Sequence, residues 1–458
     1  MKKTLLASII LMVFSNCQSN YKKTMNEPLA KKNPTKLNYH SDSLTDDYFW
    51  MRLSDDQKES SNPDSQTQDV LDYLVEENQY LDENMSDTDE LQSKLFDEYV
   101  SRIKQDDSSV PYVENGYTYS SKFEKGEDYR RYFRKKNDEG AKEELFLDLP
   151  KLAEGQKYFS LGDWSISTNN KILAYSTDYI SRREYTIHFK DLVTGEIFVD
   201  QIENTAGRIT WANDNKTIFY VKKDEQTLRS HKIFKHVLGT DSADDELVFE
   251  ETDETFGCYV YKSKSNQYLF IGSYQTLSTE IRFLDASNPN GNWTIIQPRE
   301  RGLEYSVSHY EDSFFIRTNW NAKNYKLMKT SVSSPTKENW EELIAHRDDV
   351  FLSGIEIFKK FLVIQERKDG LIQMRVMNWS NKQEHYISFN DPTYTVYADV
   401  NLEFDTDLFR FSYASLTTPN STYDYNLMSK KRTLLKQQEV LGGQFKSENY
   451  TSERLYAV

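Results

Sequence analysis

The chain reads Trp164-Ser-Ile-Ser-Thr-Asn-Asn-Lys-Ile-Leu-Ala-Tyr175 at one point and Trp211-Ala-Asn-Asp-Asn-Lys-Thr-Ile-Phe-Tyr220 at a second. Each stretch passes from a tryptophan through a polar turn ending in Asn-Lys to an apolar segment that ends in tyrosine. Clusters of Asn, Asp and Ser favour turns, and runs of aromatic and β-branched residues favour strands. The two stretches therefore predict one structural unit, a turn that leads into a strand, used twice.

The unit recurs seven times between Ser109 and Ser429, each time as an aromatic-rich strand, a polar loop and a second strand. The second strands are predicted at 129–136, 185–192, 233–238, 280–286, 325–330, 373–379 and 424–429. The pattern predicts a mainly β fold, a seven-bladed β-propeller over residues 109–440 that follows a short N-terminal α-helical segment. The residues that align in the first strand of each pair, 45 to 56 positions apart, are Tyr117, Leu173, Phe219, Phe270, Phe315, Leu362 and Phe409.

The composition is that of an acidic, aromatic-rich protein. The 458 residues include 57 Lys and Arg against 73 Asp and Glu, which gives a formal net charge of −16, and they include 25 Phe, 31 Tyr and 7 Trp. The charge argues against nucleic acid as a partner, because the phosphates would be repelled. It favours cationic ligands, although solubility is the simpler explanation of an acidic surface.

Residues 1–17 resemble a lipoprotein signal peptide. Lys2 and Lys3 precede an apolar stretch from Leu5 to Phe14 that is too short to span a bilayer, and Cys17 follows as the residue expected to be acylated. We expect an exported lipoprotein on the periplasmic or outer-membrane side, attached to the membrane only through this lipid. Secretion after conventional cleavage is the alternative.

Residues 18–40 lack periodicity and are expected to form a flexible tether, and residues 41–108 a helical segment. Asp64-Ser65 can cap a first helix, and Ser86 and Asp87 are the candidate caps of a second. Two short amphipathic helices cannot bury their apolar stripes alone, so they need another surface. The stripes consist of Leu71, Leu74, Leu81 and Met85, and of Leu91, Leu95, Tyr99 and Ile103.

A search for catalytic or cofactor-binding motifs assigns no such residue. No two of the sixteen glycines are four positions apart, so the G-x-S-x-G turn of α/β-hydrolases is absent from the 458 residues. The seven histidines are scattered, with no H-E-x-x-H, and no phosphate-binding loop occurs. No metal or cofactor is expected. Cys258 is the one thiol besides Cys17, so no disulfide is expected within the mature chain.

Several phrases resemble the N-terminal part of oligopeptidase B, in the prolyl oligopeptidase family of serine peptidases. They occur in the family's order and extend over about residues 41–458. The phrases are Asp46-Asp-Tyr-Phe-Trp-Met-Arg52, Tyr73-Leu-x-x-Glu-Asn-x-Tyr80, Lys190-Asp-Leu-x-Thr-Gly195, Trp211-Ala-x-Asp214, His236-x-Leu-Gly-Thr240, Ser263-Lys-Ser265, Pro298-Arg-x-x-Gly-x-Glu-Tyr305, His346-Arg-x-Asp-Val350 and Thr418-Pro-x-Ser-x-Tyr-Asp-Tyr425.

This resemblance implies a propeller that covers an α/β-hydrolase domain and limits access to it, in enzymes that cleave short peptides after Arg or Lys. In the family, the helical segment of residues 41–108 packs on the hydrolase domain. The catalytic Ser, Asp and His lie beyond the part that matches, so no catalytic residue is carried over. Residues 441–458 are expected to be the truncated start of that domain and to begin a strand.

Two hypotheses about function follow from the resemblance. In the first, the chain is the filtering part of a peptidase of this kind, with short basic peptides as ligands, and a separately encoded hydrolase domain is an alternative source of the catalytic part. The chain is then expected to be inactive alone. In the second, it is a non-catalytic propeller lipoprotein that binds peptides or a partner protein.

Overall fold

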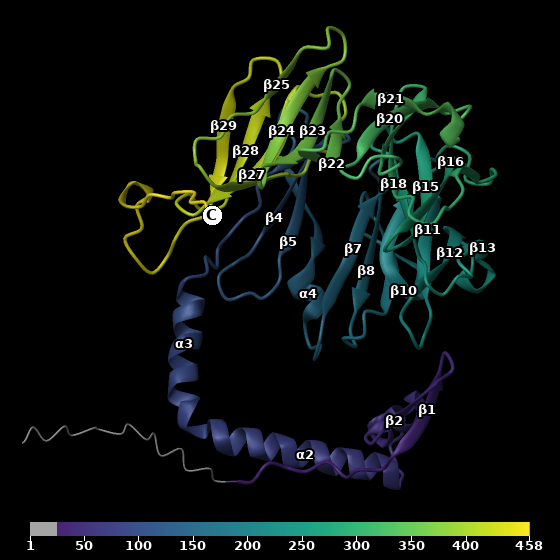
Figure 1. Ribbon diagram of the computed structural model, residues 1–458, viewed down its shortest axis with the longest axis vertical. Coiled ribbons are helices and arrows are strands. Elements are labelled where there is room, and N and C mark those ends of the chain that lie inside the picture. Colours follow the sequence, from purple (N-terminus) through teal and green to yellow (C-terminus); the bar gives the residue numbers. More distant parts are fainter. Residues whose placement is uncertain (1–24, 458) are drawn as a thin grey trace, which may run out of the picture. The chain divides into compact units, whose positions relative to one another are not determined.

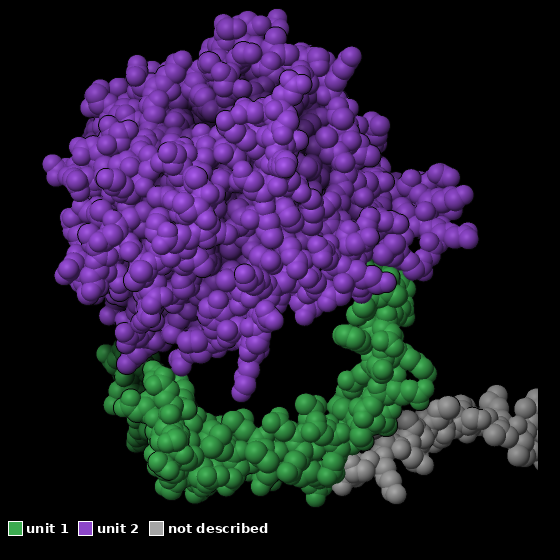
Figure 2. Space-filling model, turned by 180° about the vertical axis from the view of Figure 1, so that it is seen from behind, with its two compact units in different colours: residues 1–103 green, residues 104–458 purple. Residues whose placement is uncertain are grey.

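The computed structural model describes residues 25–457, and the signal-peptide and Cys17 predictions lie outside them. The chain divides into two compact units, residues Met1–Ile103 and Lys104–Val458, which are coloured separately in Figure 2. Within residues 25–457, no helix combines the length and the apolar character needed to cross a membrane.

The first unit begins with a β-hairpin. Strands β1 (Thr35–Tyr39) and β2 (Asp42–Asp46) pair in antiparallel fashion, and the two turn residues between them, His40 and Ser41, have φ of 48° and 74°. The tether predicted for residues 18–40 is therefore wrong at its carboxyl end. The sequence concealed the hairpin because such two-residue turns usually contain Asn-Gly or Asp-Gly.

Two helices dominate the rest of this unit, α2 (Ser65–Met85) and α3 (Asp89–Ser101). The Asp64 side chain accepts a hydrogen bond from the Thr67 amide at 2.8 Å, so the predicted first cap is confirmed. The predicted second caps are wrong, because Ser86–Thr88 forms the 3-10 turn η2 and the Thr88 side chain caps nothing. The shorter elements are η1 (Phe49–Met51) and α1 (Asp55–Glu59).

The second unit is a mainly β propeller, whose sheets follow one another in chain order (Figure 1). Five of its sheets have four antiparallel strands each, consecutive in sequence. They are β3 (Tyr112–Glu114), β4 (Tyr117–Lys122), β5 (Arg131–Lys136) and β6 (Glu143–Asp148); β14 (Gly257–Lys262), β15 (Tyr268–Gln275), β16 (Ser278–Asp285) and β17 (Thr294–Gln297); β18 (Tyr305–Tyr310), β19 (Ser313–Thr318), β20 (Lys326–Ser331) and β21 (Glu341–Ile344); β22 (Val350–Ile357), β23 (Phe361–Lys368), β24 (Leu371–Asn378) and β25 (Glu384–Tyr386); and β26 (Tyr394–Ala398), β27 (Leu408–Ser415), β28 (Ser421–Asn426) and β29 (Arg432–Gln437).

The sixth sheet has seven strands. Its central strand pairs with one neighbour from Ile197 to Thr205 and with the other from Thr205 to Trp211. The sheet pairing therefore does not confirm seven separate blades. Its strands are β7 (Ser160–Ile166), β8 (Ile172–Asp178), β9 (Tyr185–Asp191), β10 (Ile197–Trp211), β11 (Thr217–Lys223), β12 (Ser230–Val237) and β13 (Glu246–Glu250).

The hydrophobic core lies between neighbouring sheets. In one cluster, Met374 and Val376 of β24 pack with Phe409 and Phe411 of β27. The seven aligned residues of the sequence repeat lie on β4, β8, β11, β15, β19, β23 and β27. In the five four-stranded sheets this strand is the second, not the first, and in the seven-stranded sheet the two strands are the second and the fifth in chain order. The repeat is most apolar where a strand is covered on both faces.

The first and last sheets meet without exchanging a strand. Arg410 Nη1 of β27 donates to the Pro111 carbonyl at 2.7 Å, and Lys436 Nζ of β29 lies 2.7 Å from Asp107 Oδ1. The chain therefore enters and leaves the sheets at neighbouring points.

Residues 450–457 contain no strand, contrary to the prediction, and they pair with no described strand. The remaining helical turns are α4 (Leu149–Ala153), η3 (Ser242–Asp244), η4 (Lys337–Asn339) and η5 (Ser447–Asn449).

Candidate functional site: a cavity where the first strands end

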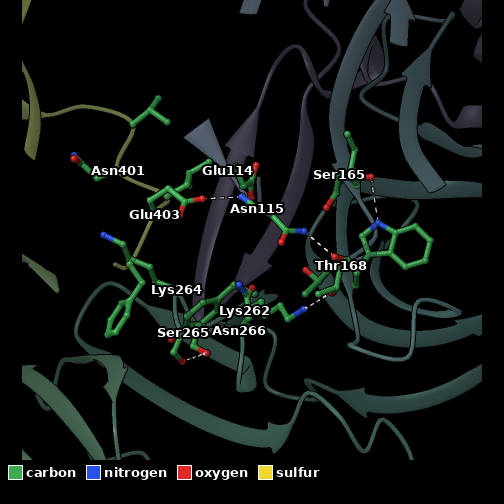
Figure 3. Close-up of a pocket in the computed structure, with 18 of the residues that line it drawn as sticks. Glu114, Asn115, Ser165, Thr168, Lys262, Lys264, Ser265, Asn266, Asn401 and Glu403 are labelled. Atoms are coloured by element: carbon green, nitrogen blue, oxygen red, sulfur yellow. Dashed lines mark hydrogen bonds between the residues drawn. The ribbon is translucent and has the colours of Figure 1, made fainter. Parts of the chain in front are cut away.

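A cavity of about 1390 Å³ lies within the second unit (Figure 3). Its walls come from β3, β7, β10, β14, β18 and β22 and from residues that follow β26. Most of the lining residues lie in the carboxyl-terminal half of these strands or just beyond them. The cavity is thus one mouth of the central channel that a propeller encloses.

Carboxylates outnumber cations on these walls. The charged lining residues are Glu114, Asp163, Glu311, Glu356, Asp399, Glu403 and Asp405 against Arg208, Lys262, Lys264 and Lys359. An excess of one sign in a confined space raises the local concentration of the opposite sign. The cavity therefore attracts cationic groups, in line with the acidity of the whole chain.

One ion pair of the cavity is poorly hydrated. Lys264 Nζ lies 3.2 Å from Glu356 Oε2 and 3.9 Å from the centre of the Phe358 ring. Burial lowers the pKa of Lys264 and raises the pKa of Glu356, which the attraction between the two charges only partly offsets. Such a pair adds little net stability, but it fixes two side chains from different sheets.

Lys262, two residues before Lys264, differs from the other lysines of the cavity. Its Nζ donates to the Thr168 hydroxyl at 3.4 Å, whereas Lys359 is paired with Asp405 at 2.6 Å. Burial lowers the pKa of Lys262 to about 8, and the charge of Asp214 opposes the shift only in part.

Two carboxylates, Glu114 and Glu403, lie near each other where the first and last sheets meet. The Asn115 amide donates to Glu403 Oε1 at 2.7 Å, and the Asn115 side chain donates to the Thr168 carbonyl at 2.7 Å. Burial raises the pKa of Glu114, and the neighbouring Glu403 raises it further. This part of the wall would be stabilised by a positive charge.

One serine near the cavity contacts a histidine, but the arrangement is not that of a catalytic triad. Ser265 Oγ lies 2.8 Å from His309 Nδ1, and the buried Nε2 of His309 has no hydrogen-bond partner in the described residues. A triad needs a carboxylate at that nitrogen. Ser265 instead belongs to the turn between β14 and β15, where its hydroxyl contacts Ser263 Oγ at 2.9 Å.

The sequence predictions named few residues of this cavity. Ser263-Lys-Ser265 was quoted only as a family phrase, and Lys262 not at all. Cys258 is buried, and burial raises the pKa of its thiol to about 12, as expected of a packed side chain. Residues 25–457 contain no group of three or more His, Cys, Asp or Glu side chains placed to hold a metal ion.

Comparison with known proteins gives consistent matches. A family model described as the N-terminal β-propeller domain of prolyl oligopeptidase matches residues 28–438. The chain is 38% identical over 445 residues to dipeptidyl aminopeptidase BI of Pseudoxanthomonas mexicana, covering 94% of this chain and 60% of that protein. It is 30% identical over 440 residues to Protease 2 of Moraxella lacunata, covering 94% and 61%.

Solved structures with similar folds include two oligopeptidases B. The structure from Leishmania major has a TM-score of 0.84 and 30% identity and covers 94% of this chain and 63% of that one. The closed form from Trypanosoma brucei with covalently bound antipain has a TM-score of 0.82 and 27% identity and covers 93% and 62%. The chain thus spans about 60% of the length of the curated relatives it matches.

Proposed function

Since the chain belongs to the family of prolyl oligopeptidase N-terminal β-propellers, we propose that it is the propeller part of an oligopeptidase B-like serine endopeptidase, which hydrolyses peptides after Arg or Lys. In this role it admits short basic peptides and keeps folded proteins out. The cavity carries the proposal, because its acidic excess attracts basic peptides and its walls limit what can enter.

We further propose that the ring has seven blades. The seven-stranded sheet then counts as two blades that share β10, the first half serving as the outer strand of one and the second half as the inner strand of the next. Gly207, at φ 92°, lies where β10 changes partners, and the register with β11 shifts between Thr205 and Ile209. A cryo-electron microscopy map of the chain with any other number of sheets around the channel would contradict this count.

The exposed apolar side chains of α2 and α3 are evidence for packing against another domain. Leu74 is 50% exposed and Phe96 is 67% exposed. Exposed apolar side chains gathered along two helices typically mark an interaction surface. We propose that this surface packs on a hydrolase domain, whether it belongs to the same polypeptide or is separately encoded. A co-purified partner without hydrolase motifs would contradict this assignment.

The 458-residue chain should not hydrolyse peptides by itself. Its sequence contains no G-x-S-x-G turn, and the Ser265–His309 contact lacks the carboxylate of a triad. We expect no turnover of a fluorogenic Arg-Arg peptide by the purified chain. Turnover that a serine-directed inhibitor abolishes would refute this view, and Ser265→Ala would then identify or exclude this serine as its source.

We also propose that Cys17 anchors the exported protein. A basic start, a short apolar stretch and this cysteine follow one another in the order that lipoprotein processing requires. The mature protein from a membrane fraction is expected to begin at Cys17 and to exceed its peptide mass by the mass of the acyl groups. An unmodified mature N-terminus would favour conventional secretion.

A further inference from the structure

Among the three lysines that line the cavity, Lys262 is the one without a carboxylate partner in the described residues. Its Nζ contacts only a neutral hydroxyl, Thr168 Oγ1, at 3.4 Å, and no described carboxylate lies within salt-bridge distance. Asp214, whose field reaches it, uses its oxygens to accept hydrogen bonds from the Lys216 and Thr217 amides. A partly desolvated ammonium without a counter-ion lowers the stability of the fold. A negatively charged oxygen of a ligand would offset this cost by accepting a hydrogen bond from Nζ.

The adjacent lysines show that this lack of a partner is particular to Lys262. Lys264 reaches across to Glu356, and Lys359 pairs with Asp405, although all three lysines line the same cavity. Lys262 ends β14 and points towards Thr168, which follows β7 of a different sheet (Figure 3). A group bound at its Nζ would therefore lie inside the channel mouth.

We propose that Lys262 binds the C-terminal carboxylate of a short peptide held in this cavity. The proposal rests on the proposed function and names the end of the peptide that the propeller recognises. The ammonium supplies a charge-assisted hydrogen bond to the carboxylate. The cavity, at about 1390 Å³, is large enough for several residues of an extended peptide.

The other walls favour a peptide over a simple anion. Glu403 lies close enough to Glu114 to raise its pKa, and carboxylates exceed cations around the cavity as a whole. A multivalent anion would be repelled by that excess, whereas a basic peptide brings a carboxylate to Lys262 and positive charge to the acidic wall. The ligand that fits is therefore a basic peptide with a free carboxyl end.

The test compares two forms of one tetrapeptide, Ala-Ala-Arg-Ala with a free carboxylate and the same peptide amidated, by calorimetric titration of the purified chain. We expect the amide to bind about 10-fold more weakly, the loss that accompanies removal of one charge-assisted hydrogen bond. Lys262→Met should abolish the difference between the peptides, and Lys262→Arg should retain it. Lys329→Met, at an exposed lysine of β20 outside the cavity, serves as the matched control and should also retain it.

The folding of Lys262→Met is checked by its unfolding temperature, which should not fall because the replaced charge has no ionic partner. Equal affinity of the wild-type chain for both peptides, or discrimination that survives in Lys262→Met, would overturn the proposal. Inorganic phosphate that competes as strongly as the free peptide would also overturn it and indicate a simple anion site. The absence of turnover in the separate fluorogenic assay tests the proposed function and does not depend on these affinities.

Discussion

Replacing Glu366 with alanine is expected to lower the free energy of unfolding of the propeller by about 3–5 kcal/mol, the cost of removing one member of a buried, hydrogen-bonded ion pair. The Glu366 side chain on β23 is fully buried, and its Oε1 accepts hydrogen bonds from Arg375 Nη2 at 2.6 Å and Nε at 3.0 Å. Arg347 also bonds Oε1, and the Tyr386 hydroxyl donates to Oε2 at 2.8 Å. One carboxylate thus holds three side chains.

The measurement is urea-induced unfolding, followed by far-ultraviolet circular dichroism. Glu384→Ala is the matched control, because Glu384 also accepts from Arg375, at 2.9 Å, but its side chain is 39% exposed. Glu384→Ala should lower the free energy of unfolding by less than about 1 kcal/mol. Glu366→Gln keeps the shape of the side chain and loses its charge, so its unfolding midpoint should lie between those of Glu366→Ala and Glu384→Ala. An unfolding midpoint for Glu366→Ala equal to that of Glu384→Ala would contradict the assigned role.

Phe270→Ala is expected to lower the free energy of unfolding by about 3–5 kcal/mol, because it removes a buried ring and leaves a cavity. Phe270 of β15 is fully buried. Its ring stacks on Tyr261 of the same sheet at 5.0 Å between centroids and meets Phe314 of the next sheet at 5.9 Å. The ring therefore lies at the centre of the apolar cluster that joins two neighbouring sheets.

Leu416→Ala, at a leucine that is 81% exposed, is the control for Phe270→Ala and should change the free energy of unfolding by no more than about 0.5 kcal/mol. Both variants are compared with the wild-type chain in the same urea titration. If Phe270→Ala shifted the midpoint no further than Leu416→Ala, the packing between these two sheets would not contribute as described.

The strands that the sequence predicted best are those with two covered faces. Phe219 and Phe270 lie in strands β11 and β15, each of which has five consecutive buried residues, so a run of apolar residues marks the strand directly. The first strands carry a weaker signal because one of their faces borders the channel. β3 has only three residues, Tyr112–Glu114, and none is fully buried.

The cavity could not be predicted because its lining residues come from the first strands, which carry this weaker signal. Glu114, Lys262 and Glu403 are far apart in the chain, and each looks like an ordinary charged residue at the end of a strand or, for Glu403, in the loop that follows one. Only the ring brings these strand ends together. The signal that could have helped was their position, since each follows the first strand of a repeat rather than the more apolar second one.

The strand β10 has a consequence for how the propeller opens. One stretch of backbone pairs with β9 up to Thr205 and with β11 from Thr205 onward, so a continuous strand with one shared residue joins the two halves of that sheet. Their amide protons should exchange with solvent in a single concerted event. The sheets β3–β6 and β26–β29 are not consecutive in the chain, so only side-chain and packing contacts close the junction between them, whereas the backbone runs without a break through Gly207 in β10.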